Sequence, residues 1–117
     1  MSDEKKTSVI DLIEKQIQQF VNEHRPPVEI RDKLDLGYSY INKIVEIFEI
    51  RSRWDNEKIK IKSPVAKTKY VKSRGVWIVY WMRASGKWER YEPDSEINNI
   101  SEFFEILNKD KYGCFWG

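Results

Sequence analysis

The chain has a single cysteine, Cys114, and a single histidine, His24, among its 117 residues. One cysteine cannot form an internal disulfide, and one thiol with one imidazole is too few for an ordinary zinc site. A Ser-His-Asp triad would have to use His24, which lies at the end of a predicted helix, where a cation suits the helix dipole. We therefore assign no catalytic residue, and the expected location is the reducing cytoplasm.

Three further features are missing from the sequence. It holds five glycines, but no phosphate-binding Gly-rich loop and no dinucleotide fingerprint. No apolar run approaches the roughly 18 residues that indicate a transmembrane helix. Residues 1–6 are polar and lack the apolar stretch of a signal peptide. We therefore predict no cofactor, no metal and no membrane association.

The composition is that of a folded soluble domain. Hydrophobic residues make up 40% of the chain and aromatic residues 14%, which is more than a disordered chain carries. A chain of this length is expected to form one domain and can bury about 65% of its unfolded surface. We predict a single domain over residues 1–117, with residues 1–6 frayed.

Apolar residues recur at helical spacing near both ends of the chain. The first helix is predicted to be capped by Ser8 and to stop at Pro26-Pro27, because a residue before proline is disfavoured in the α region. The second helix is predicted to start at Asn99, where Glu102 completes a capping box. Both helices are amphipathic, so each needs a partner surface, which the sheet can supply.

The chain ends on a short apolar tail. Gly113 lies just past the predicted second helix, where glycine commonly ends a helix. Phe115 and Trp116 are large and apolar, so both are expected to be buried against the sheet or the first helix. Cys114 lies between aromatic residues and is expected to be an inert, buried thiol.

Five segments have the alternation and the β-branched and aromatic composition of strands. They are residues 34–40, 44–51, 65–72, 77–83 and 88–92. Asn42-Lys43 and Gly86 mark turns between them. Because the strands follow one another over short connections between two helices, the predicted fold class is α+β: an N-terminal helix, a five-stranded antiparallel meander sheet and a C-terminal helix.

Residues 52–63 separate the second and third of these strands. The segment carries Trp54 and alternates three lysines with two isoleucines between Lys58 and Lys62. Alternation is typical of a strand, whereas the polarity of the segment is typical of a loop. Two predictions stay open, a polar flexible arm and a ragged edge strand.

Charge is unevenly distributed along the chain, although the net charge is only +2. Residues 51–90 hold twelve Lys or Arg and three Asp or Glu, a balance of +9, whereas residues 93–117 hold two Lys and five Asp or Glu, a balance of −3. A positive patch that also carries Trp and Tyr favours a nucleic acid or another phosphate-bearing partner. The structural alternative is that these lysines keep exposed strands soluble.

A working register assumes two-residue turns at Arg74-Gly75 and Ser85-Gly86. It pairs Lys72 with Trp77, Thr68 with Trp81, Arg83 with Trp88, and Trp81 with Arg90. One face then mixes aromatic and basic residues that form the candidate ligand-binding set, namely Tyr70, Trp77, Trp81, Arg83, Trp88 and Arg90. Aromatic rings can stack on bases and guanidinium groups can bind phosphates; the alternative is a core patch with arginines over the rings. The opposite face is expected to be core and carries Val71, Ile78, Tyr80, Met82 and Tyr91.

We therefore predict a non-enzymatic binding module for nucleic acid or another phosphate-bearing ligand. The alternative is a protein-interaction or scaffold domain, which includes a homodimer, because unallocated aromatic residues and an apolar tail suit an interface. An enzyme ranks third. Glu49 with Lys67 would suit a metal-plus-lysine nuclease site, although carboxylates paired with the excess of cations explain the same residues.

Several short elements occur in order along residues 25–117. They are Arg25-Pro26-Pro27, Glu49 through Trp54, Pro64 through Lys67, Trp77 through Arg83, Lys87 through Tyr91, and Asp110 through Gly117. The set resembles a bacterial family of small domains of unknown function, and the closing Gly-x-Phe-Trp-Gly is among its most specific parts. The resemblance implies a small bacterial cytosolic domain and brings no activity, cofactor or catalytic residue.

Overall fold

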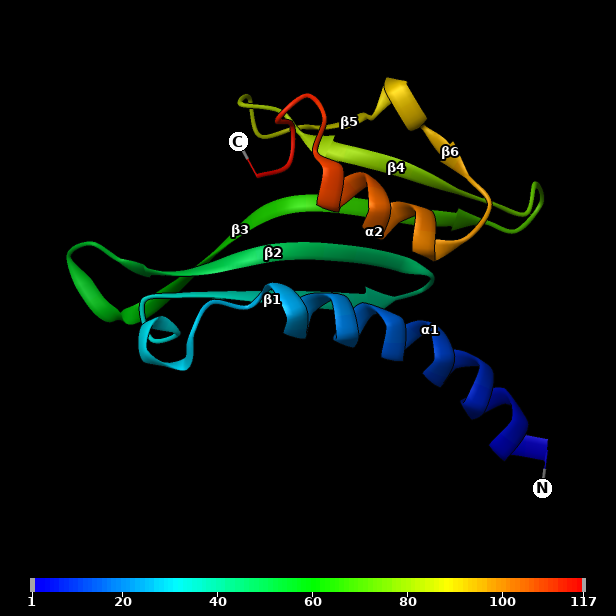
Figure 1. Cartoon of the computed structure of the whole chain (residues 1–117), viewed down its shortest axis with the longest axis horizontal. Helices are drawn as coiled ribbons and strands as arrows, with labels where there is room; N and C mark the ends of the chain where they lie inside the picture. Colours follow the sequence, from blue (N-terminus) through cyan, green and yellow to red (C-terminus); the bar gives the residue numbers. More distant parts are fainter. Residues whose placement is uncertain (1, 117) are drawn as a thin grey trace.

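The computed structural model describes residues 2–116, and it describes the side chains of residues 12–116. Its elements in chain order are α1 (Ser2–His24), the 3-10 turn η1 (Val28–Ile30), β1 (Leu34–Ile41), β2 (Ile44–Arg53), β3 (Asn56–Val71), β4 (Val76–Met82), β5 (Trp88–Arg90), the 3-10 turn η2 (Glu92–Asp94), β6 (Glu96–Ile97) and α2 (Ile100–Lys109). Figure 1 shows α1 alongside β1 and α2 near β4, with the two chain ends marked. The predicted α+β class is confirmed.

The sheet is an antiparallel meander in the order β1-β2-β3-β4-β5. A sixth strand, β6, pairs antiparallel with β4 at Trp77 and Ile78, beyond the part of β4 that pairs with β5. The two short strands therefore share one edge of β4. The predicted five-strand order is right, and β6 was missed because a two-residue strand is too short to show alternation.

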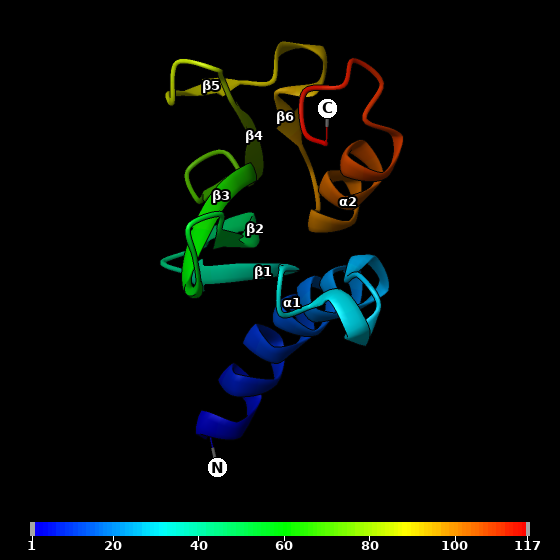
Figure 2. The ribbon, with the colours of Figure 1, turned by 90° about the vertical axis from the view of Figure 1, so that its left-hand side faces the viewer.

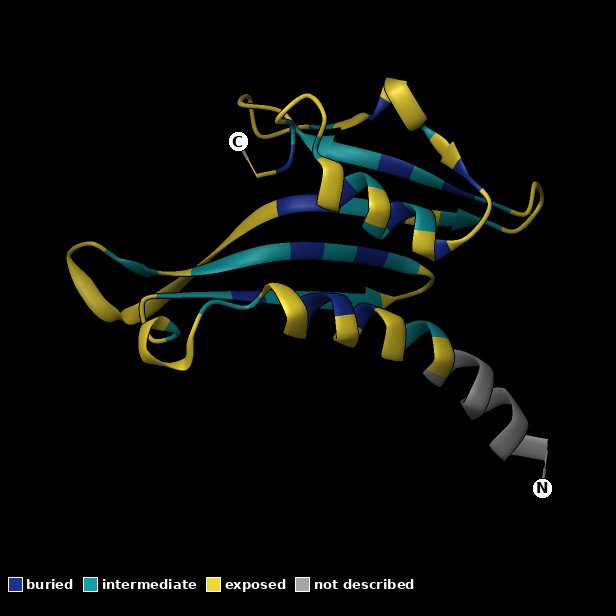
Figure 3. Ribbon diagram, viewed as in Figure 1, coloured by how far each residue is buried: buried dark blue, intermediate teal, exposed yellow. Residues whose placement is uncertain are grey.

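Residues 52–63 are not a loop. β2 continues to Arg53, the turn is at Trp54 and Asp55, and β3 runs for 16 residues from Asn56. Pairing with β2 extends to Arg53 and Asn56, whereas β4 pairs with β3 only from Ala66 onward. The β2–β3 hairpin therefore extends past its neighbours, as Figure 1 shows at the left, and its end is exposed in Figure 3.

Both helices pack on the same face of the sheet, which Figure 2 shows from the side. The helical residues that enter the core are Ile17, Phe20 and Val21 of α1 and Ile100, Phe103 and Leu107 of α2. They cover buried strand residues that alternate along the sheet, including Leu36, Val45, Ile47, Ala66, Trp77 and Val79. The opposite face carries no helix among the described residues.

The ends of the helices match the sequence signals in part. α1 ends at His24, directly before Arg25 and the two prolines, as predicted. It starts at Ser2 and not at Ser8; the predicted Ser8 cap and the fraying of residues 1–6 concern side chains outside the described range. No helix in the described part of the chain is long and apolar enough to cross a membrane.

The capping box predicted for α2 is present. Asn99 Oδ1 accepts from the Glu102 backbone N–H, and the Glu102 carboxylate accepts from the Asn99 N–H in return. The helix ends at Asp110, which is left-handed with φ 37°, so Asp110 and not Gly113 is the residue that ends it. The Asp110 carboxylate explains this exception, because it accepts from the backbone N–H groups of Phe115 and Trp116 and so folds the tail back.

The tail packs through one of its two aromatic residues. Phe115 is 7% exposed and its ring centroid lies 5.0 Å from that of Tyr91. Trp116 is 39% exposed, so its predicted burial is wrong. Its indole Nε1 donates to the Leu107 carbonyl at 2.8 Å, and its ring is nearly parallel to that of His24, with the ring centroids 6.3 Å apart. The indole therefore lies at the ends of the two helices, where part of the ring contacts solvent.

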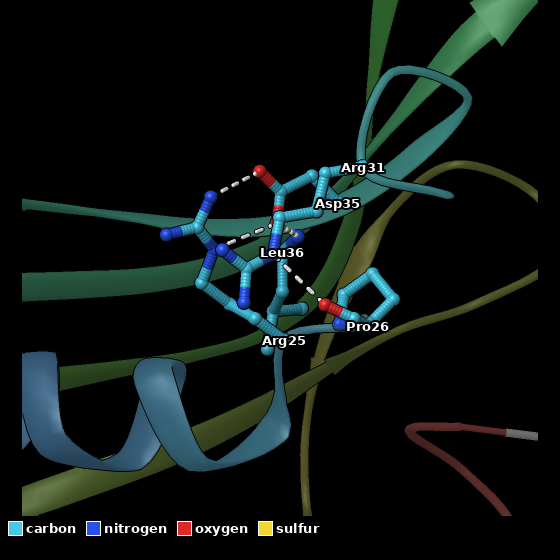
Figure 4. Close-up of polar contacts among 5 residues, drawn as sticks. All are labelled: Arg25, Pro26, Arg31, Asp35 and Leu36. Atoms are coloured by element: carbon cyan, nitrogen blue, oxygen red, sulfur yellow. Dashed lines mark hydrogen bonds and ion pairs between the residues drawn. The ribbon is translucent and has the colours of Figure 1, made fainter. Parts of the chain in front are cut away.

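An ion pair fixes the end of α1 to the start of β1 (Figure 4). Arg25 donates through Nε and Nη2 to the two carboxylate oxygens of Asp35, at 2.9 and 2.7 Å. Asp35 also accepts from the Leu36 N–H at 2.7 Å, and Arg31 Nε donates to the Pro26 carbonyl. The hydrogen bonds from Arg25 hold the pKa of Asp35 below its usual range.

Asp35→Asn is expected to reduce stability at pH 7 and to reduce its acid dependence. A carboxyl whose folded pKa is depressed adds stability above its unfolded pKa of about 3.9, and this stability is lost as the pH falls through the folded pKa. Urea midpoints between pH 7 and pH 2 measure both effects. Asp32→Asn, at an exposed carboxylate nearby, is the matched control; an equal acid slope in the wild type and Asp35→Asn would contradict the role of the pair.

Phe115→Ala is expected to lower the free energy of unfolding by about 3–5 kcal/mol, because it leaves a cavity beside Tyr91. Trp116→Ala should cost clearly less, since much of that side chain already contacts water. Urea unfolding of both variants measures the difference. Equal losses would mean that the tail acts as one unit held by Asp110 rather than through Phe115.

Candidate functional site on the open face of the sheet

The strand register differs from the predicted one at both turns. β3 and β4 pair Tyr70 with Trp77 and Thr68 with Val79, a shift of two residues that leaves the faces of both strands unchanged. β4 and β5 pair Tyr80 with Arg90, whereas the prediction paired Trp81 with Arg90. This slip of one residue moves the whole of β5 to the other face.

The physical reason is the length of the turns. The connection between β4 and β5 spans residues 83–87, closed by a hydrogen bond from Arg83 N–H to the Lys87 carbonyl at 2.9 Å. The prediction assumed two residues at Ser85-Gly86. A slip of the pairing by one residue moves every side chain of one strand to the other face of the sheet. The assumed length of this turn therefore decided on which face the side chains of β5 were placed.

The six predicted site residues therefore do not share one face. Tyr70, Trp77 and Trp81 lie on the face that the helices cover; Trp77 is buried and the other two are half-buried against the core. Trp88 and Arg90 lie on the opposite face. Arg83 follows the end of β4 and forms an ion pair with Glu89 at 3.3 Å. The prediction that these residues share one face of the sheet is therefore wrong.

The face away from the helices, here called the open face, carries a second set of aromatic and charged residues. Its large and charged members from β2 to β6 are Ile44, Glu46, Phe48, Ile50, Lys62, Lys67, Lys69, Ile78, Tyr80, Met82, Trp88, Arg90 and Glu96. Most of them are half-buried by their neighbours, and none is fully buried. Ile78, Tyr80 and Met82, predicted as core residues under the helices, belong to this set.

Lys67 lies at the centre of the open face between two aromatic rings. Its ammonium nitrogen is 4.8 Å from the ring centroid of Tyr80 and 4.8 Å from that of Trp88. Burial lowers the pKa of Lys67, the nearby Glu46 carboxylate opposes this, and Lys69 adds to the lowering. The ammonium therefore has less water than an ordinary surface lysine, and the two rings and the charge of Glu46 favour its charged form.

Phe48 forms a second pairing of a ring with a cation on the same face. Its ring covers Gly37 of β1, where an added Cβ would lie 2.8 Å from Phe48 Cε2. Only glycine leaves room for the ring at this position. The Lys62 ammonium lies 4.8 Å from the Phe48 ring centroid. Two aromatic clusters, each with a lysine, thus lie on the helix-free side of the sheet.

The charge of the open face is positive around these rings. The rings are surrounded by four cations, Lys62, Lys67, Lys69 and Arg90, and by two carboxylates, Glu46 and Glu96. Glu96 is already shared by Arg90, at 3.6 Å, and by Arg74. Cations beside aromatic rings on an exposed sheet are an arrangement that can bind an anion next to a flat ring system.

The residues considered for catalysis are not brought together. Glu49 pairs with Leu36 and Ser63 and binds Arg51, whereas Lys67 pairs with Glu46 on the other face. The predicted Glu49–Lys67 pair is therefore wrong. Among the described side chains, no group of three His, Cys, Asp or Glu residues could hold a metal ion.

The two unusual side chains of the sequence have structural surroundings. His24 Nδ1 lies 2.7 Å from the Phe20 carbonyl in the last turn of α1, and Nε2 lies 2.6 Å from Asn108 Oδ1 of α2. Cys114 is half-buried. Burial raises the pKa of its thiol, and the Asp110 carboxylate adds to this, so the thiol stays protonated near neutral pH.

Sequence reasoning missed Phe48, Lys67 and Tyr80 as surface residues. A signal was present in part, because lysine recurs at alternate positions of β3, whereas β4 carries aromatic residues on both of its faces. The strand pattern does not say which of the two faces of β4 is exposed. The helices decide this, because they cover the face that contains Trp77 and Val79.

The comparisons with known proteins agree with this picture of a domain without assigned chemistry. A family model described as "Domain of unknown function (DUF3024)" matches residues 5–117. No curated protein and no solved structure matches the chain. The resemblance to a family of small domains of unknown function is thereby confirmed. Because the match spans nearly the whole sequence, the chain belongs to the DUF3024 family.

Proposed function

We propose that the chain is a non-enzymatic binding module whose open face holds a single-stranded nucleic acid. The observation that carries the proposal is the Lys67 ammonium between the rings of Tyr80 and Trp88, on a face without helices. Aromatic rings on a sheet offer stacking surfaces that accept every base, and cations beside them accept the phosphates.

The charge of the face supports this ligand class. The depressed pKa of Lys67 reflects water lost by burial, and a phosphate beside it would compensate for that loss. Lys69 and Arg90 flank the rings and can contact successive phosphates of one strand. The proposal keeps Trp88 and Arg90 from the predicted set and replaces the buried Trp77 by Tyr80 as a stacking residue.

The other two predicted functions have less support. A protein-interaction or scaffold role drew on an apolar tail, and Phe115 of that tail packs in the core. An enzyme drew on Glu49 and Lys67, which lie on different faces. A location in the bacterial cytoplasm is part of the proposal and rests on the single cysteine and the family resemblance.

Single-stranded DNA of about 12 nucleotides is expected to quench tryptophan fluorescence at low salt. Affinity should fall steeply with salt, because bound phosphates release counterions. Trp88→Ala should weaken binding by about 1–3 kcal/mol through lost stacking, and Lys67→Ala should reduce the salt slope by about one unit if Lys67 contacts one phosphate.

The matched controls lie on the helix side of the molecule. Trp116→Phe changes another partly exposed tryptophan, and Lys111→Ala changes a lysine that also lies over a ring, 5.5 Å from the centroid of Tyr112. Neither should alter binding. An absence of quenching at low salt, or equal losses in Trp88→Ala and Trp116→Phe with both variants folded, would reject the open face as the site.

A further inference from the structure

The first half of β3 has one unpaired edge. β4 pairs with β3 from Ala66 to Val71, whereas Asn56 and residues 60–64 pair only with β2 within the described chain, and residues 57–59 lie in a register shift of that ladder. All residues from Trp54 to Pro64 are exposed, and Figure 3 shows this end of the hairpin in the exposed colour. We call the outer side of residues 56–64 the open edge. An edge of this kind presents backbone groups that another strand can pair with.

The hydrogen bonds on the other side of β2 show which backbone groups face outward. Ser52 donates its N–H to the Lys33 carbonyl at 3.0 Å, so the backbone groups of Ser52 point away from β3. Its partner across the ladder, Lys60, therefore belongs to a non-hydrogen-bonded pair, and its own N–H and C=O point to the open edge.

The same orientation recurs at every second residue from Lys60 to Pro64. It does not extend to residues 57–59, because the register shifts between the pairs Ser52 with Lys60 and Arg53 with Asn56; there the Lys58 N–H donates to Asn56 Oδ1 at 3.1 Å. Pro64, which has no N–H, occupies an outward position, where a missing donor costs nothing in the ladder with β2. The open edge therefore offers the N–H groups of Lys60 and Lys62 and the carbonyls of Lys60, Lys62 and Pro64.

The side chains along this edge separate by charge. Lys60 and Lys62 lie on the side of the open face, where the Lys60 ammonium donates to the Asp32 carbonyl and to Ser52 Oγ and the Lys62 ammonium lies over the Phe48 ring. Ile61 lies on the other side and is 46% exposed. A strand added here would meet two lysines on one face and Ile61 on the other.

This pattern disfavours a second copy of the chain. Two identical antiparallel strands related by a twofold axis pair residues with the same alternation, because only such residues have outward backbone groups. Each register centred between Lys60 and Lys62 places one of these lysines opposite another lysine, and like charges directly opposite are destabilising. The lysines thus protect the edge against self-association, and they leave it complementary to a strand of opposite charge.

We propose that the open edge of β3 binds an extended acidic segment of a protein partner as an added antiparallel strand. The segment would carry Asp or Glu at alternate positions, opposite Lys60 and Lys62, and an apolar residue between them, against Ile61. Backbone hydrogen bonds to Lys60 and Lys62 supply affinity, and the two lysines fix the register. The pairing uses the edge of the sheet and not its face, and Lys62 is a side chain that this edge shares with the open face.

A seven-residue peptide that alternates Glu and Val, with blocked ends, is the probe. It should bind at low salt, and a peptide that alternates Lys and Val should not. Amide hydrogen exchange should slow at Lys60 and Lys62, whose N–H groups become paired, and change little at Ile61 and Ser63, which face β2. Binding without this alternation of protection would overturn the proposal, as would failure of the Glu-Val peptide to bind.

The matched variants separate strand addition from general attraction of anions. Lys62→Glu should weaken the Glu-Val peptide about three- to tenfold, because it replaces an attractive cross-strand pair by a repulsive one. Lys62 is exposed and its ammonium lies over the Phe48 ring, so circular dichroism checks that the variant is folded. Lys69→Glu changes an exposed lysine of the same strand whose edge β4 already covers, so it should leave peptide affinity unchanged. Equal weakening by both variants would overturn the proposal. So would an outcome in which Lys62→Glu weakens single-stranded DNA but not the peptide, since the edge would then serve a nucleic acid.

Discussion

The side of the pleat on which each residue lies depends on one bulge in β3. Between the pairs of Ile47 with Ala66 and of Phe48 with Pro64, β3 contains one extra residue, Val65. Beyond the bulge, Ala66, Thr68 and Tyr70 face the helices. Before it, Lys60 and Lys62 face the open side, although all five have even numbers. Without the extra residue, the two lysines would turn toward the helix side, and Ile61 would turn to the open face.

The helices and the strand order could be predicted from the sequence because their signals are local. Pro26 and Pro27 end α1, the Asn99–Glu102 box starts α2, and Asn42 and Lys43 adopt the positive φ angles of a tight hairpin turn, as their position between two strands indicated. Each of these signals acts within a few residues of the position that it determines. None requires knowledge of what packs against it.

The faces could not be predicted because they depend on non-local facts. The length of the turn after Met82 decides whether Trp88 and Arg90 lie beside Trp81 or beside Tyr80. The position of the helices decides which of the two aromatic sets is core, and both sets are rich in large apolar residues. The long first half of β3 was underestimated for a related reason: its polarity resembles a loop, since one of its edges and much of its surface contact water.

The contact of His24 with both helices has a practical consequence. The ring is stacked on Phe20, with centroids 4.1 Å apart, and its two nitrogens contact a carbonyl of α1 and the Asn108 side chain of α2. Because the sequence has no other histidine, the imidazole Hε1 gives the one histidine Hε1 signal in a one-dimensional proton NMR spectrum recorded in heavy water. Its chemical shift reports whether α1 and α2 are docked together, without isotope labelling and without perturbing any residue of the open face or the open edge.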